Sequence, residues 1–253
     1  MILFVHGMGF SSDRNYWKDW AVPLQNELAK QSLELTDEQF DGVYYYDLVP
    51  GPKHGKGQAE GVLQIQIIGL KKRAEEELGS LRSPYAKEIG AIRKLSDSIV
   101  DNFGDIFTYL YLEKTHQEVN KRLYEMIDKS KEPVHLIGYS LGSIVSFCAL
   151  MQNQTAAQKV NHLLLVGSPL FWFKQGVARH ADLDSRPLVG RFTNIAGTID
   201  IAWPQMVPKI LSGLDSNLEF IINPFNPIKG HQEYFYRGEG LQAIASEIVR
   251  GWV

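Results

Sequence analysis

Short apolar runs that alternate with longer helical patterns constrain the fold of this chain more than any other feature. The runs are rich in β-branched and aromatic residues, and they cover residues 2–5, 43–48, 134–138, 163–166, 192–196 and 218–222. Their apolarity is nearly continuous, as in parallel strands that are buried on both faces. We therefore predict an α/β fold, in which a mostly parallel sheet of about six strands is flanked by helices.

The length of the chain favours one domain over residues 1–253. With 253 residues and 44% hydrophobic content, the chain can bury one substantial core. The segment between residues 50 and 131 is too long for an ordinary connection. We predict a helical cap or insertion within the domain at residues 52–112. Glycines at 51–61 precede apolar residues at 65–70, a pattern that fits either a mobile lid with a lipid-binding surface or a rigid cap.

Two helical patterns are expected around this insertion. Thr115 and Glu118 have the spacing of a capping box, and they predict a helix that starts near Thr115. Its apolar face is formed by Val119, Leu123, Met126 and Ile127. A second stripe, expected to lie in the core, is formed by Ile99, Phe103, Ile106, Phe107 and Leu110.

Charge and cysteine content exclude several classes of protein. The net charge is −3 and the pI is near 6.2, so no overall field favours nucleic acid or an acidic membrane. Cys148 has no partner for an internal disulfide, and the N-terminus lacks a signal-peptide pattern, so we expect a cytoplasmic protein. The apolar stretch 134–151 includes a histidine, glycines and serines, which fit a strand, a turn and a helix better than a membrane span.

The motif Gly138-Tyr139-Ser140-Leu141-Gly142 lies between a predicted strand and a helix-compatible stretch. In this context the glycines allow backbone and helix to approach closely, and the turn projects the Ser140 hydroxyl above the sheet. A glycine-rich turn without catalytic function is the alternative, because the bare pattern also arises by chance. The flanking strand and helix favour a nucleophilic serine.

Taken in order along the chain, these features resemble the α/β-hydrolase family, in particular its compact lipases and serine esterases. His6-Gly7-Met8-Gly9 follows the first predicted strand and is similar to the oxyanion loop of that family. The resemblance covers nearly the whole chain, least in the insertion, and the two leading strands of the family are missing. It implies that the backbone N–H groups of Met8 and Leu141 form the oxyanion hole and that His6 supports the loop.

The order of the family triad, serine, then acid, then histidine, selects the general base. His231 follows the last predicted strand and every plausible aspartate. By contrast, His162 introduces a predicted central strand, and His180 precedes the downstream acids. A solvated loop histidine is the alternative interpretation of His231.

The same order narrows the acid to Asp200, which follows the predicted strand 192–196 and so lies where a loop can reach the histidine. The rival carboxylates lie in polar loops, within a strand or beyond the histidine, and they are Asp182, Asp184, Asp215, Glu219 and Glu233. We predict Ser140, Asp200 and His231 as a catalytic triad.

These residues predict a serine hydrolase that cleaves carboxylic esters, of the esterase or lipase type, through an acyl-enzyme and without a cofactor. The expected partner is a small-molecule or lipid ester, with transient contact to a lipid surface. Aromatic residues in the predicted loops could line an acyl pocket or simply pack, and they are Tyr16, Trp17, Phe171, Trp172 and Trp203.

Other functions remain as alternatives. A thioesterase, an amidase or an acyltransferase can share the same triad, and a non-catalytic binding protein can share the fold. Residues 7–12 partly match a dinucleotide-binding pattern, but Ser12 stands where the third glycine belongs. The histidines show no metal-ligand spacing, so we expect no metal site.

Overall fold

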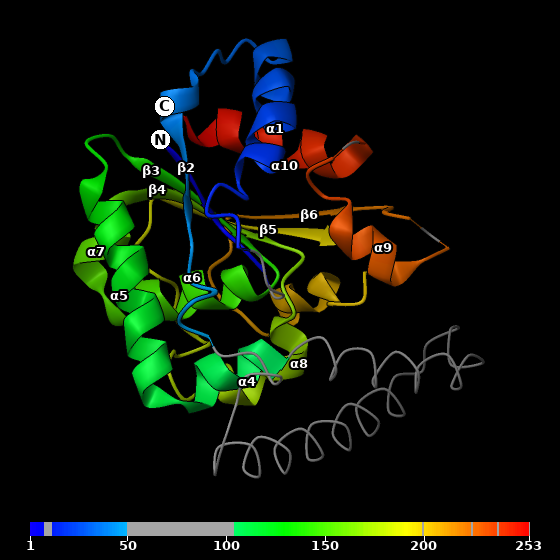
Figure 1. The fold of residues 1–253 in the computed structure, drawn as a ribbon. Coiled ribbons are helices and arrows are strands. Elements are labelled where there is room, and N and C mark those ends of the chain that lie inside the picture. The colour runs from blue at the N-terminus through cyan, green and yellow to red at the C-terminus, as the bar shows by residue number, and fades with distance from the viewer. Residues whose placement is uncertain (8–11, 50–103, 199, 224, 237, 253) are drawn as a thin grey trace.

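The computed structural model describes residues 1–7, 12–49, 104–198, 200–223, 225–236 and 238–252 (Figure 1). Its centre is a six-stranded sheet in the order β2-β1-β3-β4-β5-β6, and every neighbouring pair of strands is parallel. The strands are β1 (Ile2–Val5), β2 (Phe40–Val43), β3 (Val134–Tyr139), β4 (Val160–Val166), β5 (Arg191–Gly197) and β6 (Ser216–Phe220). The predicted parallel sheet with flanking helices is confirmed.

Strand β1 is buried on both faces, which explains why its sequence is apolar without interruption. In β1, Leu3 and Val5 belong to the core on one side of the sheet, whereas Ile2 and Phe4 belong to the core on the other. All four side chains are at most 1% exposed. Alternation of this kind is what a pleated strand produces when each face is covered by helices.

Helices cover the two faces of the sheet in separate groups (Figure 1). On one face lie α1 (Lys18–Lys30) and α10 (Gly238–Gly251), which pack against each other and the sheet. On the other lie α4 (Gly104–Tyr111), α5 (Glu113–Lys129), α6 (Leu141–Gln152), α7 (Gln154–Gln158) and α8 (Leu170–Val177). The short α9 (Pro227–Gln232) lies beyond the carboxyl ends of β5 and β6, and short 3-10 helices cover Asp37–Gln39 and Pro204–Lys209.

The second predicted strand was placed wrongly, because the structure has β2 at Phe40–Val43 rather than at residues 43–48. This strand lies at the edge of the sheet, and its middle residues are only partly buried, so its sequence carries no apolar run. The tyrosines that suggested a strand, at residues 44–46, follow β2 and lie outside the sheet. Tyr45 and Tyr46 stack on His6, with ring centroids 3.9 and 3.6 Å from the imidazole.

The predicted helix near Thr115 exists, but its capping box does not. Helix α5 begins at Glu113, and Thr115 is a buried residue within its first turn. Leu112 is the one residue between α4 and α5, and its N–H donates to Thr108 O while its carbonyl accepts from His116 N–H. The chain therefore passes directly from one helix into the next and needs no side-chain cap. The expected apolar face is buried as predicted, apart from the partly exposed Met126.

The predicted insertion at 52–112 lies mostly outside the described residues. Its described end, α4, is part of the domain core, because Ile106, Phe107 and Leu110 are at most 1% exposed. The rest of the stripe, Ile99 and Phe103, lies outside the described residues, as does the segment that suggested a lid. None of the helices in the described part of the chain is long and apolar enough to cross a membrane.

Candidate active site

Ser140 lies at the turn between β3 and α6, in a backbone conformation that is unusual for a residue with a side chain. Its φ and ψ are 53° and −123°. Glycines on either side make this turn possible: a Cβ on Gly138 would lie 2.7 Å from Gly142 O, and one on Gly142 would lie 2.1 Å from Val5 O. Strained backbone is retained where the surrounding structure fixes it, and such positions cluster at functional sites. The sharp turn predicted from the motif is present.

Three predicted residues meet beside this turn in one hydrogen-bonded chain. The Nε2 atom of His231 is 2.9 Å from Ser140 Oγ, and its Nδ1 atom is 2.8 and 3.0 Å from the two carboxylate oxygens of Asp200. All three residues are buried, with exposures of 2%, 8% and 2% for Ser140, His231 and Asp200. Because the carboxylate can only accept, Nδ1 carries the proton of the neutral ring, and the Nε2 lone pair faces the hydroxyl.

Parallel strands explain how distant parts of the sequence come together here. Ser140 follows β3, Asp200 follows β5, and His231 lies on α9 after β6. In a parallel sheet all carboxyl ends meet at the same edge, and ligand sites of open α/β sheets lie outside that edge. The order of elements therefore brings all three side chains together at the carboxyl edge of the sheet.

Asp200 is held by two further donors. The N–H of Ala202 donates to Oδ1 at 2.7 Å, and the hydroxyl of Tyr234 donates to Oδ2 at 2.5 Å. The same hydroxyl accepts the N–H of Gly197 at 2.8 Å, which ties it to the end of β5. Tyr234 was not predicted from the sequence, because nothing in its local pattern distinguishes it from a core aromatic residue.

The other candidate histidines and carboxylates make contacts elsewhere in the fold. His162 pairs with Thr193 at 2.9 Å on β4 and β5, and His180 faces Leu110 O at 2.7 Å. The other acids contact turns or cations: Asp182 accepts from Ser185 and Asp184, Asp215 pairs with Arg186, Glu219 accepts from Asn217, and Glu233 pairs with Lys229. None of these contacts involves Ser140 or His231.

The loop after β1 touches the serine directly. A Cβ on Gly7 would lie 2.8 Å from Ser140 Cβ, so only glycine fits without displacement. His6 fixes the preceding turn: its Nε2 accepts the N–H of Tyr45 at 3.1 Å, and its Nδ1 is 2.8 Å from Gly7 O. Burial lowers the pKa of His6 to about 3, so the ring is neutral and Nδ1–H donates to Gly7. This arrangement supports the predicted role of His6.

Of the two predicted oxyanion donors, Leu141 lies among the described residues. Leu141 is the first residue of α6, so its N–H is one of the helix N-terminal donors, and its side chain is fully buried in the core. Met8 lies outside the described residues. Both assignments remain predictions.

The five predicted pocket residues fall into two groups. Tyr16 and Trp17 pack within the fold, since the Tyr16 hydroxyl lies 2.9 and 3.1 Å from Phe4 O and Val43 O, and Trp17 covers Gly42. Phe171, Trp172 and Trp203 form one aromatic cluster, in which the two indoles stack at 5.3 Å. The indole N–H of Trp172 donates to Ile201 O at 3.1 Å, next to Asp200 in sequence. The cluster thus adjoins the loop that carries the acid.

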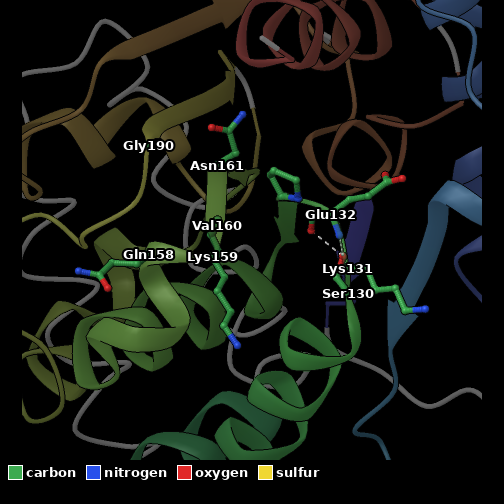
Figure 2. Close-up of a pocket in the computed structure, with 9 residues that line it drawn as sticks. Ser130, Lys131, Glu132, Gln158, Lys159, Val160, Asn161 and Gly190 are labelled. Atoms are coloured by element: carbon green, nitrogen blue, oxygen red, sulfur yellow. Dashed lines mark hydrogen bonds between the residues drawn. The ribbon is translucent and has the colours of Figure 1, made fainter.

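A surface hollow of about 470 Å³ lies at the opposite end of the sheet (Figure 2). It is lined by residues 130–133 before β3, residues 158–161 around the start of β4, and Gly190 before β5. Because these are the amino ends of the strands, the hollow is separate from Ser140.

The two other kinds of site considered from the sequence are a metal site and a dinucleotide-binding loop. Within the described ranges, no three His, Cys, Asp or Glu side chains are grouped so that they could hold a metal ion. The partial dinucleotide pattern at 7–12 falls largely on residues 8–11, which lie outside the described part.

No family model matches the sequence, and comparison with curated proteins finds no match.

Proposed function

We propose that this protein is a serine hydrolase of the α/β-hydrolase fold that cleaves carboxylic esters through an acyl-enzyme on Ser140. The observation that carries the proposal is the continuous chain of contacts from Asp200 through His231 to Ser140, at 2.8 and 2.9 Å. A serine nucleophile requires an adjacent base, and the base requires a third group that orients it. Buried residues at the carboxyl edge of the sheet meet both requirements.

The proposed reaction begins when Ser140 Oγ attacks the ester carbonyl and its proton passes to His231 Nε2. The tetrahedral intermediate then collapses, the bond to the leaving alkoxide breaks, and His231 returns the proton to that oxygen. A water molecule attacks the acyl-enzyme in the same manner, and release of the acid restores Ser140. Asp200 orients the imidazole and stabilises the imidazolium that forms twice per cycle.

Negative charge on the carbonyl oxygen needs donors that are already in place. The N–H of Leu141, directly after the nucleophile, fits this role, and the N–H of Met8 is the proposed partner. Loss of one such donor typically lowers turnover about 10²- to 10³-fold. In the family the second donor comes from the loop after the third strand, and the loop after β1 is its proposed counterpart here.

The proposed substrate class rests on the surroundings of the loop that carries Asp200. In the cluster of Phe171, Trp172 and Trp203, the first two side chains are buried and Trp203 is partly exposed. We propose that Trp203 contacts a moderately apolar acyl group, including that of a lipid ester. Thioesters, amides and acyl transfer use the same intermediate and remain alternatives. Transient contact with a lipid surface and a cytoplasmic setting remain predictions from the sequence.

Labelling with a fluorophosphonate, followed by peptide mapping, tests the proposal. We expect the wild-type protein to be labelled at Ser140 and to hydrolyse members of a panel of short- and long-chain p-nitrophenyl esters. Ser140→Ala should abolish both while its far-UV spectrum and melting temperature stay close to wild type. Folded wild-type protein that is neither labelled nor active on any ester would reject the enzyme in favour of a non-catalytic binding protein.

A further inference from the structure

Tyr234 joins the end of β5 to the carboxylate of Asp200 through a single hydroxyl. Its oxygen accepts the Gly197 N–H at 2.8 Å and lies 2.5 Å from Asp200 Oδ2. Because the backbone N–H supplies the proton of the first contact, the phenolic proton is directed to the carboxylate. Tyr234 is fully buried, so no water competes for either bond.

The surroundings of the contact between Tyr234 and Asp200 are closely packed. A Cβ on Gly167, which has a φ of +56°, would lie 2.9 Å from the Tyr234 ring and 3.2 Å from Asp200 Oδ2. The same atom would lie 3.3 Å from Cε1 of His231. Because Gly167 has no side chain and adopts a left-handed conformation, Tyr234, Asp200 and His231 can all pack closely against it.

We propose that Tyr234 is a positioning residue of the Ser140 site, which holds the Asp200 carboxylate in the plane of the His231 imidazole and tempers its negative charge. The inference rests on the proposed function and deepens it. With Ala202 N–H on Oδ1 and Tyr234 on Oδ2, each carboxylate oxygen has its own donor besides His231 Nδ1. A carboxylate fixed at both oxygens cannot rotate away from the imidazole.

The protonation of Tyr234 agrees with this role. Burial, together with the nearby charge of Asp200, raises the pKa of Tyr234 well above its ordinary value. The hydroxyl therefore remains a donor across the pH range in which an esterase works. A donor to Asp200 draws charge from the carboxylate, so the proton of the imidazolium is held less tightly. The tyrosine thus influences how strongly Asp200 stabilises the imidazolium of His231.

Tyr234→Phe is the direct test, because it keeps the ring and removes only the hydroxyl. We expect kcat/KM to fall about tenfold at the optimum. We also expect the low-pH limb of the kcat/KM profile to move up by about half a pH unit, because the imidazolium is then held more tightly. The matched control is Tyr109→Phe, which removes another buried hydroxyl, one that donates to Asn120 Oδ1 at 2.8 Å, away from the site. It should lower stability but leave the profile unmoved.

A second variant keeps the test decisive if Tyr234→Phe folds poorly. Site-specific replacement of Tyr234 by 3,5-difluorotyrosine keeps the hydroxyl and makes it a stronger donor, so the low-pH limb should move down instead of up. Folded variants whose low-pH limb stays where it is in the wild type would overturn the proposal.

A spectroscopic measurement separates this inference from the proposed function. The proton between His231 Nδ1 and Asp200 is expected to give a downfield proton resonance, and Tyr234→Phe should shift it while Tyr109→Phe should not. If that shift occurs but wild-type protein cleaves no ester, the positioning contact stands and the proposed function fails. If wild-type protein is active and the resonance is unchanged in Tyr234→Phe, the positioning role fails alone.

Discussion

The Cα of Gly7 lies so close to Ser140 that an added methyl group would come within 2.8 Å of the serine Cβ. This contact joins the loop after β1 to the turn after β3, and it fixes the distance between the proposed nucleophile and the proposed oxyanion loop. Side-chain carbons essentially never approach so closely, so a larger residue at position 7 must displace one of the two segments.

We therefore expect Gly7→Ala to lower kcat more than tenfold with little change in fold, because catalytic geometry is sensitive to small displacements. The control is Gly230→Ala, next to His231, where the new Cβ would meet its nearest neighbours at an ordinary 3.4 Å. Steady-state kinetics on one soluble ester would compare the two. Equal loss of activity in both variants would argue against a specific role for the Gly7 contact.

Asp200→Asn should reduce kcat by about 10³-fold or more, because an amide at this position can donate to Nδ1 and so places the ring proton on Nε2, facing Ser140. The base would then be unable to accept the serine proton. Asp182→Asn serves as the control, since Asp182 accepts hydrogen bonds from Ser185 and Asp184 within an exposed turn. Comparable activity in wild type and Asp200→Asn would show that another group orients His231.

Trp203→Ala is expected to change the preference for acyl chains. Trp203 stacks on Trp172 at 5.3 Å and is only partly buried, so its loss removes apolar surface beside the acid loop. We expect kcat/KM to fall about tenfold for long-chain esters and less for acetyl esters, in line with about 0.8 kcal/mol for each buried methylene group. Trp252→Ala is the control, because Trp252 packs on His135 at 4.5 Å. A parallel loss for all chain lengths would assign Trp203 to packing alone.

Stability should decline in mild acid because of buried histidines outside the site. Burial, together with His162 and the N-terminal charge, lowers the pKa of His135 to about 3. Between the ordinary value of 6.5 and about 3, the unfolded state binds a proton that the folded state does not, so the free energy of unfolding falls as the pH falls. For one such histidine the loss between pH 7 and pH 5 is about 2 kcal/mol.

Denaturant unfolding at pH 7 and pH 5 measures this loss. His135→Phe retains a ring against Trp252 but cannot bind a proton, so its stability should fall less between the two pH values than that of the wild type. Among the described residues, none is a hydrogen-bond partner of the His135 Nδ1 atom, so the substitution removes no such contact there. Identical pH dependence in both proteins would mean that His135 does not contribute.

The buried strands and the turn at Ser140 could be predicted because their residues are dictated by local physics. Strand β1 and residues 163–166 of β4 are buried on both faces, so these stretches are apolar throughout, and the Ser140 turn needs glycines at fixed positions. The meeting of Ser140, Asp200 and His231 also followed, because chain order and parallel topology bring the three to one edge. Their catalytic roles remain predictions.

The features that were missed depend on neighbouring elements in the fold rather than on a pattern within their own residues. The edge strand β2 includes Asp41 and Gly42, since a strand with one neighbour need not be apolar. The start of α5 is determined by α4 before it rather than by a side-chain cap. The contact of Tyr234 with Asp200 spans 34 residues and leaves no periodic pattern in the sequence.

The position of β1 in the sheet has a consequence for biosynthesis. Val5 pairs with Val43 on one side but with Gly138 on the other, so one edge of the entirely apolar β1 has no partner in the sheet until β3 has also been synthesised. Pairing over such a separation is slow, and the exposed edge can associate with other nascent chains in the meantime. We expect the yield of folded protein to depend on chaperones that shield β1 while translation continues.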